Sequence, residues 1–241
     1  MKSIKFFALC AIALLSAACC SMPKVAPQPE GITKGDVDTA SYALGVYYGQ
    51  MILMNNLGDL NASQIIKGFK DALKDAESET PKFDQNFVGD AMNKFMMKKS
   101  ELEAAQNLKE GEEFLAKNAT ADGVQVTDTG IQYLVVREGN GVFPTNDKDT
   151  VLVCYEGSTL DGKVFDSSYE REDTVSFPLN RVIKGWTEGM KHADEGSEVI
   201  LWIPSELAYG QRGPMGPNQT LKFKVELIEV KPFVEPAADA E

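Results

Sequence analysis

Apolar residues recur at spacings of three and four in the N-terminal half of the chain, the period of an amphipathic helix. Residues 36–52, DVDTASYALGVYYGQMI, follow this period, and Asp38 or Thr39 is available as the helix cap. Asn61 gives a second start signal, and the apolar face behind it consists of Ile65, Ile66, Phe69 and Leu73. The pattern predicts two short amphipathic helices.

A third helical segment is much longer than the first two. Thr80-Pro81 interrupts the chain, Asp84 offers a cap, and residues 85–118 contain no proline. A helix of this length measures roughly 50 Å at a rise of about 1.5 Å per residue. Two short helices cannot cover it, and its polar second half predicts a solvent-exposed stalk that joins two bodies.

Methionines gather in the same half of the chain, at Met51, Met54, Met92, Met96 and Met97. Methionine fills irregular gaps in cores, and it also builds pliable contact surfaces. Core filling is the first interpretation of this cluster. A surface for self-association or for client proteins is the second.

The period of the apolar residues changes to two after residue 128. Turns rich in Gly, Asn, Asp and Pro separate strand-like runs at 130–139, 149–158, 174–179, 197–204 and 220–230. One helix-compatible segment, residues 182–193, lies between the third and fourth runs. The whole pattern predicts an α+β protein: an N-terminal all-α domain with a long connecting helix, then a curved antiparallel sheet wrapped around one short helix.

The first eighteen residues have the order of a secretory signal. Lys2 and Lys5 precede an apolar run over residues 6–15, and small residues follow it. The run is too short to span a bilayer as a stable helix. We therefore expect residues 1–18 to be absent from the mature protein.

Cys19 follows these small residues, as in a bacterial lipobox, although Ser16 stands where Leu, Val or Ile is usual. We expect Cys19 to be lipidated, and ordinary cleavage after Ala18 is the alternative. Residues 19–34 contain prolines and no apolar period, which predicts a flexible tether.

Charge and residue counts exclude several classes of function. The net charge is −12, so the chain lacks the basic surface that nucleic acids require. His192 is the only histidine and lies in a polar turn, where we expect it at the surface. Zinc-spaced cysteines, a phosphate-binding glycine loop and a calcium loop are all missing from the sequence, so we expect no metal and no cofactor.

Aromatic residues are the remaining candidates for a site, because they fall in or beside the strands and the short helix. Ordinary core packing explains any one of them. Their combination with the neighbouring acid Asp166 is harder to assign to packing. The set consists of Tyr155, Phe165, Phe177, Trp186, Tyr209 and Phe223.

Five motifs in this half resemble FKBP-type peptidyl-prolyl cis-trans isomerases. They are VCYEGSTLDGKVFDSS, VIKGW, EGMK, IPSELAYG and TLKFKVELIEV, and they agree with the family in order and spacing from about Gly130 to Val230. In the helical half, SYALGVYYGQ and GFKDAL resemble the N-terminal dimerisation domain of the macrophage infectivity potentiator and FkpA group of envelope isomerases. The second resemblance is less specific, and it implies a homodimer that forms through the helices.

The resemblance implies a pocket that binds proline. Trp186 would form its floor, Val182 and Ile183 would contribute a wall and a backbone N–H, and Tyr209 would donate its hydroxyl to the substrate carbonyl. Arg171 would pair with Asp166. The implied catalytic residues are Tyr155, Phe165, Asp166, Trp186, Tyr209 and Phe223, and the implied substrate-binding residues are Arg171, Phe177, Val182, Ile183 and Met215.

The chain departs from the family pattern at two places. Val175 stands where an aromatic residue is frequent, which predicts a more open rim. The loop after Tyr209 is shorter than usual, and Met215 would replace an aliphatic contact there.

We therefore expect an isomerase that assists the folding of exported, proline-containing polypeptides in the bacterial envelope, facing the periplasm and anchored through Cys19. A holdase chaperone that uses the pocket mainly to bind clients is the alternative. The expected organisation is a helical dimerisation domain over 35–120, an isomerase domain over 121–233 and an acidic tail over 234–241.

Overall fold

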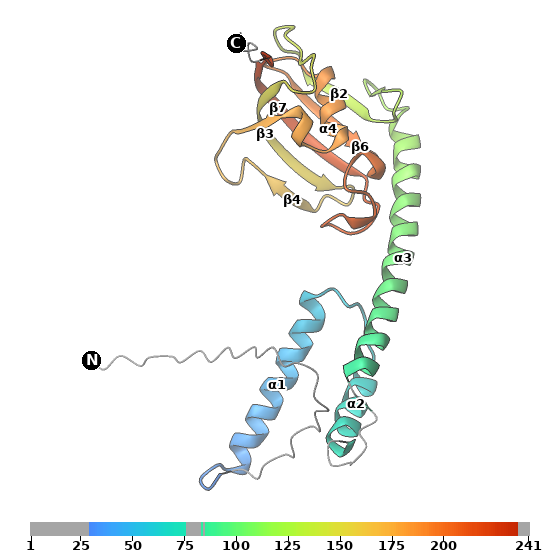
Figure 1. The fold of residues 1–241 in the computed structure, drawn as a ribbon, viewed down its shortest axis with the longest axis vertical. Helices are drawn as coiled ribbons and strands as arrows, with labels where there is room; N and C mark the ends of the chain where they lie inside the picture. The colour runs from blue at the N-terminus through green and yellow to red at the C-terminus, as the bar shows by residue number, and fades with distance from the viewer. Residues whose placement is uncertain (1–28, 76–82, 84, 236–241) are drawn as a thin grey trace, which may run out of the picture. The chain divides into compact units, whose positions relative to one another are not determined.

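A computed structural model describes residues 29–75, 83 and 85–235 of the 241-residue chain (Figure 1). The predicted signal, Cys19, the Asp84 cap and most of the acidic tail lie outside these residues. The chain divides into two compact units, and the boundary falls between Met96 and Met97. Among the described helices, none combines the length and the apolar character that crossing a membrane requires.

The first unit contains α1 (Lys34–Met54) and α2 (Ala62–Asp75). The predicted cap of α1 is wrong, because the helix begins at Lys34 and Thr33 caps it. The Thr33 hydroxyl accepts a hydrogen bond from the Asp36 N–H, and the Asp36 carboxylate accepts one from the Thr33 N–H. This reciprocal pair satisfies two N–H groups at the helix end. The predicted start of α2 is confirmed, since Asn61 Oδ1 accepts from the Gln64 N–H at 3.2 Å.

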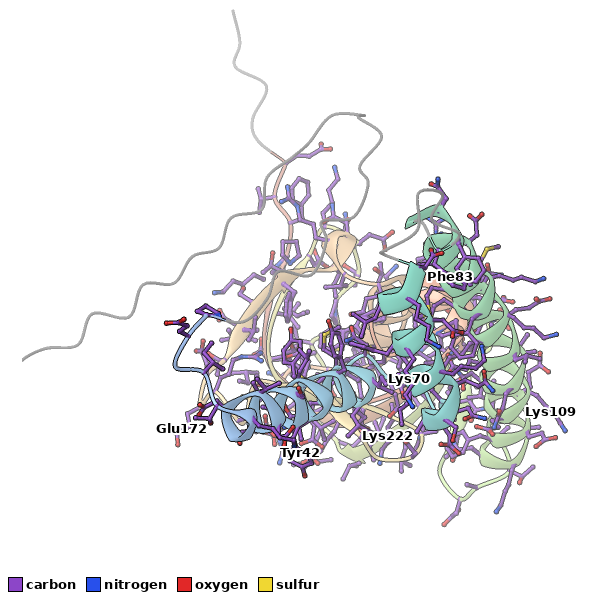
Figure 2. The ribbon with its side chains drawn as sticks, turned by 90° about the horizontal axis from the view of Figure 1, so that it is seen from below. Tyr42, Lys70, Phe83, Lys109, Glu172 and Lys222 are labelled. Carbon is purple, nitrogen blue, oxygen red and sulfur yellow. The ribbon has the colours of Figure 1, made fainter. Side chains whose placement is uncertain are left out.

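Apolar side chains of the first unit are largely exposed. Helix α1 has no buried residue, and Figure 2 shows Tyr42 projecting from it. The five methionines are between 39% and 85% exposed, so the core-filling interpretation is wrong for the isolated chain. Tyr48 of α1 and Phe69 of α2 are in edge contact, with ring centroids 5.9 Å apart. These helices therefore leave apolar surface available for a partner.

Helix α3 spans Gln85–Asn118, as predicted. Its second half belongs to the same compact unit as the sheet, and one face of it is covered there. The covered stripe, called the α3 stripe below, consists of Glu103, Ala104, Asn107, Gly111, Phe114, Leu115 and Asn118. The stalk prediction is wrong for this face, because polar as well as apolar side chains of the stripe pack on the second unit.

The second unit is built on a seven-stranded antiparallel sheet, with the order β1-β2-β6-β7-β3-β4 and β5 paired to the other end of β3. Its strands are β1 (Gln125–Val126), β2 (Gln132–Arg137), β3 (Thr150–Thr159), β4 (Val164–Ser167), β5 (Val175–Pro178), β6 (Glu198–Ile203) and β7 (Leu221–Lys231). The sequence pattern predicts five of these strands. It misses β1, which has only two residues, and β4, whose sequence VFDS does not alternate between apolar and polar residues.

The short helix α4 (Lys184–Gly189) lies across one face of the sheet, between the 3-10 turns η1 (Leu179–Arg181) and η2 (Met190–His192) (Figure 1). A Cβ atom on Gly185 would lie 2.2 Å from the side chain of Ile203, so only glycine permits this close packing. The α+β prediction is confirmed. His192 is half-buried and stacks on Tyr133 at 4.5 Å, which corrects its predicted surface placement.

Candidate active site

Residues from four strands, from η1 and α4 with the two residues between them, and from the loop after β6 line a cavity of about 380 Å³. Cavities of a few hundred cubic ångströms are typical of sites for small ligands. The lining residues are Tyr155, Phe165, Asp166, Phe177, Arg181, Val182, Ile183, Trp186, Tyr209 and Phe223.

Trp186 lies at the base of this cavity and is almost completely buried. Its ring meets those of Tyr155, Phe177 and Phe223 edge to face, at centroid distances of 5.3, 5.7 and 5.4 Å. Phe165 in turn packs against Phe223 at 5.8 Å. Edge-to-face pairs of this kind are worth about 0.5–1.5 kcal/mol each beyond their buried area. The cluster therefore holds the indole in one orientation, with an apolar surface toward the cavity.

The β3–β4 hairpin brings Phe165 and Asp166 to the same cavity, although consecutive strand residues normally point to opposite faces. The pairing shifts register between Gly157 and Ser158, and an irregularity of this kind re-aims a side chain. Gly157 also makes room for the rings. A Cβ atom at this position would lie 2.7 Å from the rings of both Phe165 and Phe223.

The polar side of the cavity is a hydrogen-bonded group of three residues. The Tyr155 hydroxyl donates to the Asp166 carboxylate, and Arg171 Nη1 donates to the other carboxylate oxygen at 2.6 Å. Burial raises the pKa of Asp166, but the hydrogen bonds from Tyr155 and Arg171 outweigh it and hold that pKa below its ordinary value. Burial and then the bond to Asp166 raise the pKa of Tyr155. At neutral pH the group therefore contains a carboxylate, a guanidinium and a neutral phenol.

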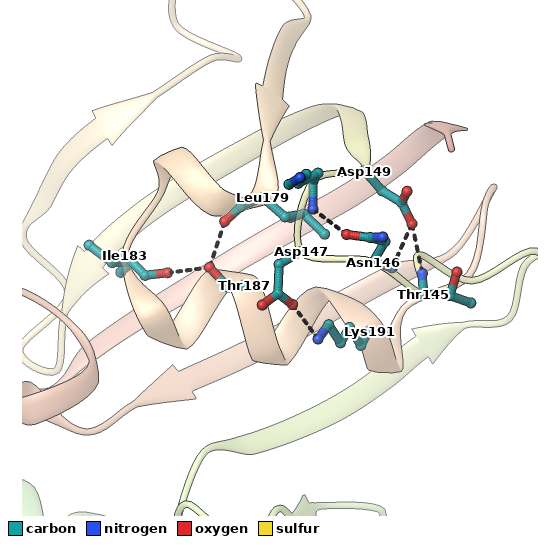
Figure 3. Close-up of polar contacts among 9 residues, drawn as sticks. Thr145, Asn146, Asp147, Asp149, Leu179, Ile183, Thr187 and Lys191 are labelled. Carbon is teal, nitrogen blue, oxygen red and sulfur yellow. Dashed lines mark hydrogen bonds and ion pairs between the residues drawn. The ribbon is translucent and has the colours of Figure 1, made fainter. Parts of the chain in front are cut away.

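A second network fixes the segment that carries Val182, Ile183 and Trp186 (Figure 3). Thr187 Oγ1 donates to the Leu179 carbonyl at 2.6 Å, and the Leu179 N–H donates to the Asp149 carbonyl at 2.9 Å. Asp149 is 2% exposed, and its carboxylate accepts hydrogen bonds from the N–H groups of Thr145, Asn146 and Phe233. Burial raises the pKa of Asp149, and these three bonds lower it to a net value below the ordinary one. The segment before α4 is thus hydrogen-bonded, through Leu179, to the loop that Asp149 organises.

Among the hydrogen-bond donors at the cavity that have no partner in the described part of the chain, two suit a peptide carbonyl. They are the hydroxyl of Tyr209 and the backbone N–H of Ile183, and both residues line the cavity. Burial, and then the charge of Asp166, raise the pKa of Tyr209, so its hydroxyl keeps its proton at neutral pH. A peptide carbonyl in the cavity could accept a hydrogen bond from either donor.

The structure brings most of the residues singled out in the sequence to one cavity, with three exceptions. Arg171 does not line the cavity but bonds to Asp166, and Met215 packs against the hydrophobic core instead. Val175 also packs against the core and does not line the cavity. Arg181 was missed. It is exposed, it lines the cavity, and among the described residues its guanidinium has no partner; its position directly before Val182 was the available signal.

Comparison with known proteins identifies both halves of the chain. A family model described as FKBP-type peptidyl-prolyl cis-trans isomerase matches residues 143–228. A second model, described as the domain amino terminal to FKBP-type peptidyl-prolyl isomerase, matches residues 37–135. These matches cover the sheet and the helical half in the order that the sequence resemblance predicts.

Individual relatives agree with this result. The chain is 40% identical to the FKBP-type peptidyl-prolyl cis-trans isomerase FkpA of Escherichia coli K12 over 237 residues, which is 93% of this chain and 86% of that protein. It is 35% identical to the outer membrane protein MIP of Legionella longbeachae, covering 81% of this chain and 86% of that protein. The crystal structure of FkpA from Escherichia coli matches with a TM-score of 0.64 and 38% identity, over 83% of this chain and 99% of that one.

Proposed function

The chain belongs to the family of FKBP-type peptidyl-prolyl cis-trans isomerases, and on this premise we propose that the cavity over Trp186 is where it isomerises X-Pro bonds. One observation carries the proposal. Aromatic rings around an apolar floor, an ionised Asp166 and two unpaired donors converge on a single cavity. The prolyl ring would rest on Trp186, and the flanking peptide would face Tyr209 and Ile183.

The chemistry to be accelerated is a rotation without bond cleavage. The barrier is about 18–20 kcal/mol because the twisted amide loses its resonance. The planar amide is the more polar form, so an apolar cavity disfavours it relative to the twisted one. Rings that are already packed against each other provide this environment without rearranging during the reaction.

The two donors hold the peptide while the amide turns. A hydrogen bond from Tyr209 or Ile183 to a substrate carbonyl fixes one side of the rotating bond, and donors that are already oriented need no reorganisation. The Asp166 carboxylate, held by Tyr155 and Arg171, places a fixed negative charge at the polar side of the cavity. No proton transfer to the substrate is required.

The assay is protease-coupled isomerisation of a short X-Pro peptide by the full chain. Tyr209→Phe removes one donor and should lower kcat/KM at least fivefold. Tyr169→Phe removes a hydroxyl that bonds Glu226, outside the cavity, and should leave the activity unchanged. Equal activities for all three proteins would contradict the assignment of the cavity.

We propose that the helical part of the chain forms a homodimer. The exposed apolar side chains of α1 and α2 support this, as does the match of residues 37–135 to the amino-terminal domain of the family. Light scattering of the purified chain should give twice the mass of one chain. Tyr42→Glu places a charge at a 77% exposed aromatic position and should shift the equilibrium toward monomers. We retain 35–120 and 121–233 as the proposed domain limits.

For location, we propose the bacterial envelope, with a lipid on Cys19 and exported proteins as clients. The sequence of the first nineteen residues motivates this, and one relative is named an outer membrane protein. Two or more acyl chains are needed for stable anchoring. Radiolabelled palmitate should be incorporated by the wild type and not by Cys19→Ser. No labelling in either protein would favour cleavage after Ala18, and equal labelling of both would place the lipid on a residue other than Cys19.

Client holding is the second candidate function, and the exposed apolar surface of α1 and α2 favours it. The two functions separate in an aggregation assay with a proline-containing client diluted from denaturant. If Tyr209→Phe suppresses aggregation as well as the wild type does, holding operates without turnover. If suppression falls in proportion to the isomerase activity, catalysis accounts for both.

A further inference from the structure

The α3 stripe is hydrogen-bonded to the loop that follows Tyr209. Asn107 Nδ2 donates to the Pro217 carbonyl at 2.7 Å, and Asn218 Nδ2 donates to the Ala104 carbonyl at 3.3 Å. The first hydrogen bond is donated by α3 to the loop, and the second is donated by the loop to α3. Both join residues more than a hundred positions apart in the sequence. Both contacts lie within the second compact unit.

Close packing accompanies these hydrogen bonds. Gly111 is buried one turn beyond Asn107, and a Cβ atom there would lie 2.3 Å from Thr220 Oγ1. Glycine is a poor helix former, so its place inside α3 is explained by this approach of the helix to Thr220. Farther along, Gln132 Nε2 donates to the Leu115 carbonyl at 2.7 Å. The second half of α3 is therefore fixed to the second unit at several points along its length.

The loop connects this contact to the candidate active site. The Asn218 N–H donates to the Gly210 carbonyl at 2.9 Å, and Gly210 directly follows Tyr209. The backbone of Asn218 is left-handed, with φ of 52°, a conformation that asparagine tolerates better than most residues. Gly213 packs against Tyr209, since a Cβ atom on it would lie 3.2 Å from Tyr209 Cβ. A short chain of contacts thus runs from α3 through Asn218 to the residue that bears the free hydroxyl.

We propose that Asn107 and Asn218 are positioning residues for the isomerase reaction, which hold the loop so that the Tyr209 hydroxyl faces the substrate carbonyl. The inference rests on the proposed function of the cavity. Neither asparagine lines the cavity, so both act through Tyr209 and leave the apolar floor untouched. Loss of either amide should therefore reduce turnover more than it reduces peptide binding.

The test uses the full chain and three variants. Asn107→Ala removes the bond to Pro217. Asn218→Gly removes the bond to Ala104 but keeps the left-handed backbone and the N–H to Gly210. Lys109→Ala is the matched control, because Lys109 lies on the outer side of α3, its side chain 75% exposed (Figure 2). Each variant is measured for kcat and KM with an X-Pro peptide, and its fold is checked by circular dichroism.

We expect kcat to fall about fivefold in Asn107→Ala and Asn218→Gly, with KM within twofold of the wild type and Lys109→Ala unchanged. In a Tyr209→Phe background the same substitutions should have no further effect, because the hydroxyl that they position is gone. A general loosening of the structure would instead lower kcat by the same factor in both backgrounds. That result, or unchanged kcat in the folded variants, would overturn the proposal.

The outcomes also separate this inference from the function on which it rests. If Tyr209→Phe alone leaves the activity intact, the cavity assignment fails, and the inference fails with it. If Tyr209→Phe lowers the activity while both asparagine variants match the wild type, only the positioning role fails.

Discussion

Gly157 leaves the room that two aromatic rings of the cavity occupy. The Cβ atom of an alanine there would lie 2.7 Å from Phe165 Cζ and 2.7 Å from Phe223 Cε1, well inside ordinary contact distance. Since the φ angle of Gly157 is not in the left-handed region, the substitution carries no backbone strain, and its whole effect comes from packing. Overpacking of this kind costs about 1–3 kcal/mol of the free energy of unfolding. The rings must shift by several tenths of an ångström to relieve it.

We expect Gly157→Ala to lower the unfolding temperature of the sheet domain by about 4–12 °C, measured by calorimetry. It should also reduce kcat/KM at least tenfold, because both displaced rings line the cavity. In the double variant Gly157→Ala with Phe165→Leu, the smaller side chain removes the clash with Phe165 but leaves the one with Phe223, and should restore part of the stability but not the activity. A Gly157→Ala protein with unchanged melting and unchanged activity would refute the packing that we describe around Trp186.

Four further predictions concern charged groups and their hydrogen bonds. Between pH 5 and 9, kcat/KM should be constant. The lowered pKa of Asp166 keeps the carboxylate ionised over this range, and the raised pKa of Tyr155 keeps the phenol neutral. A bell-shaped pH profile of kcat/KM would contradict this. The contribution of Asp166 to stability should likewise be fully present above its ordinary pKa of 3.8 and be lost only as the pH falls through its lower folded value, which acid titration of unfolding measures. Because Arg181 is positively charged, kcat/KM should be about threefold higher for a peptide with Glu beside the proline than for one with Gln, as expected for charges about 6 Å apart in water. Arg181→Gln should abolish this difference in kcat/KM, and a preference for Glu that survives the substitution would exclude this role. Asp149→Ala leaves the N–H groups of Thr145, Asn146 and Phe233 without their acceptor. It should lower the free energy of unfolding by about 3 kcal/mol in denaturant titrations, at about 1 kcal/mol for each bond; a loss below about 0.5 kcal/mol would show that water replaces the carboxylate.

Local signals predicted some elements well. The long helix follows from a proline-free run with good helix formers, and its limits at Gln85 and Asn118 match the structure. The start of α1 was placed too late, because the Thr33–Asp36 capping box lies before the first apolar residue of the helix. Strand β4 was missed because four residues with a register shift show no alternation, although it carries Phe165 and Asp166.

The periodicity of apolar residues does not predict contacts between segments that are distant in the sequence. The second half of α3 was predicted to be exposed because it is polar. Its covered face makes its contacts through side-chain amides, such as that of Asn107, and through Gly111. A search for apolar periodicity does not detect residues of these types. For the exposed methionines the error is the reverse, since apolar residues predicted to be buried are exposed. An apolar stripe has the same spacing whether it faces its own core or another chain. Arg181 was overlooked because its residue type is the same for a cavity-lining and for a solvated position, and only its place directly before Val182 indicated the cavity.

The two tryptophans of the chain distinguish peptide binding in the cavity from binding elsewhere, since X-Pro peptides should bind over Trp186 and be isomerised there. Trp202 is buried in β6, pairs across the sheet with Gln132, and does not line the cavity. In a ¹⁵N spectrum of the full chain titrated with a proline peptide, the Trp186 indole signal should shift while that of Trp202 stays in place. Exchange peaks between the cis and trans peptide should appear in the same samples. A shift confined to Trp202, or binding at Trp186 without exchange peaks, would contradict the account.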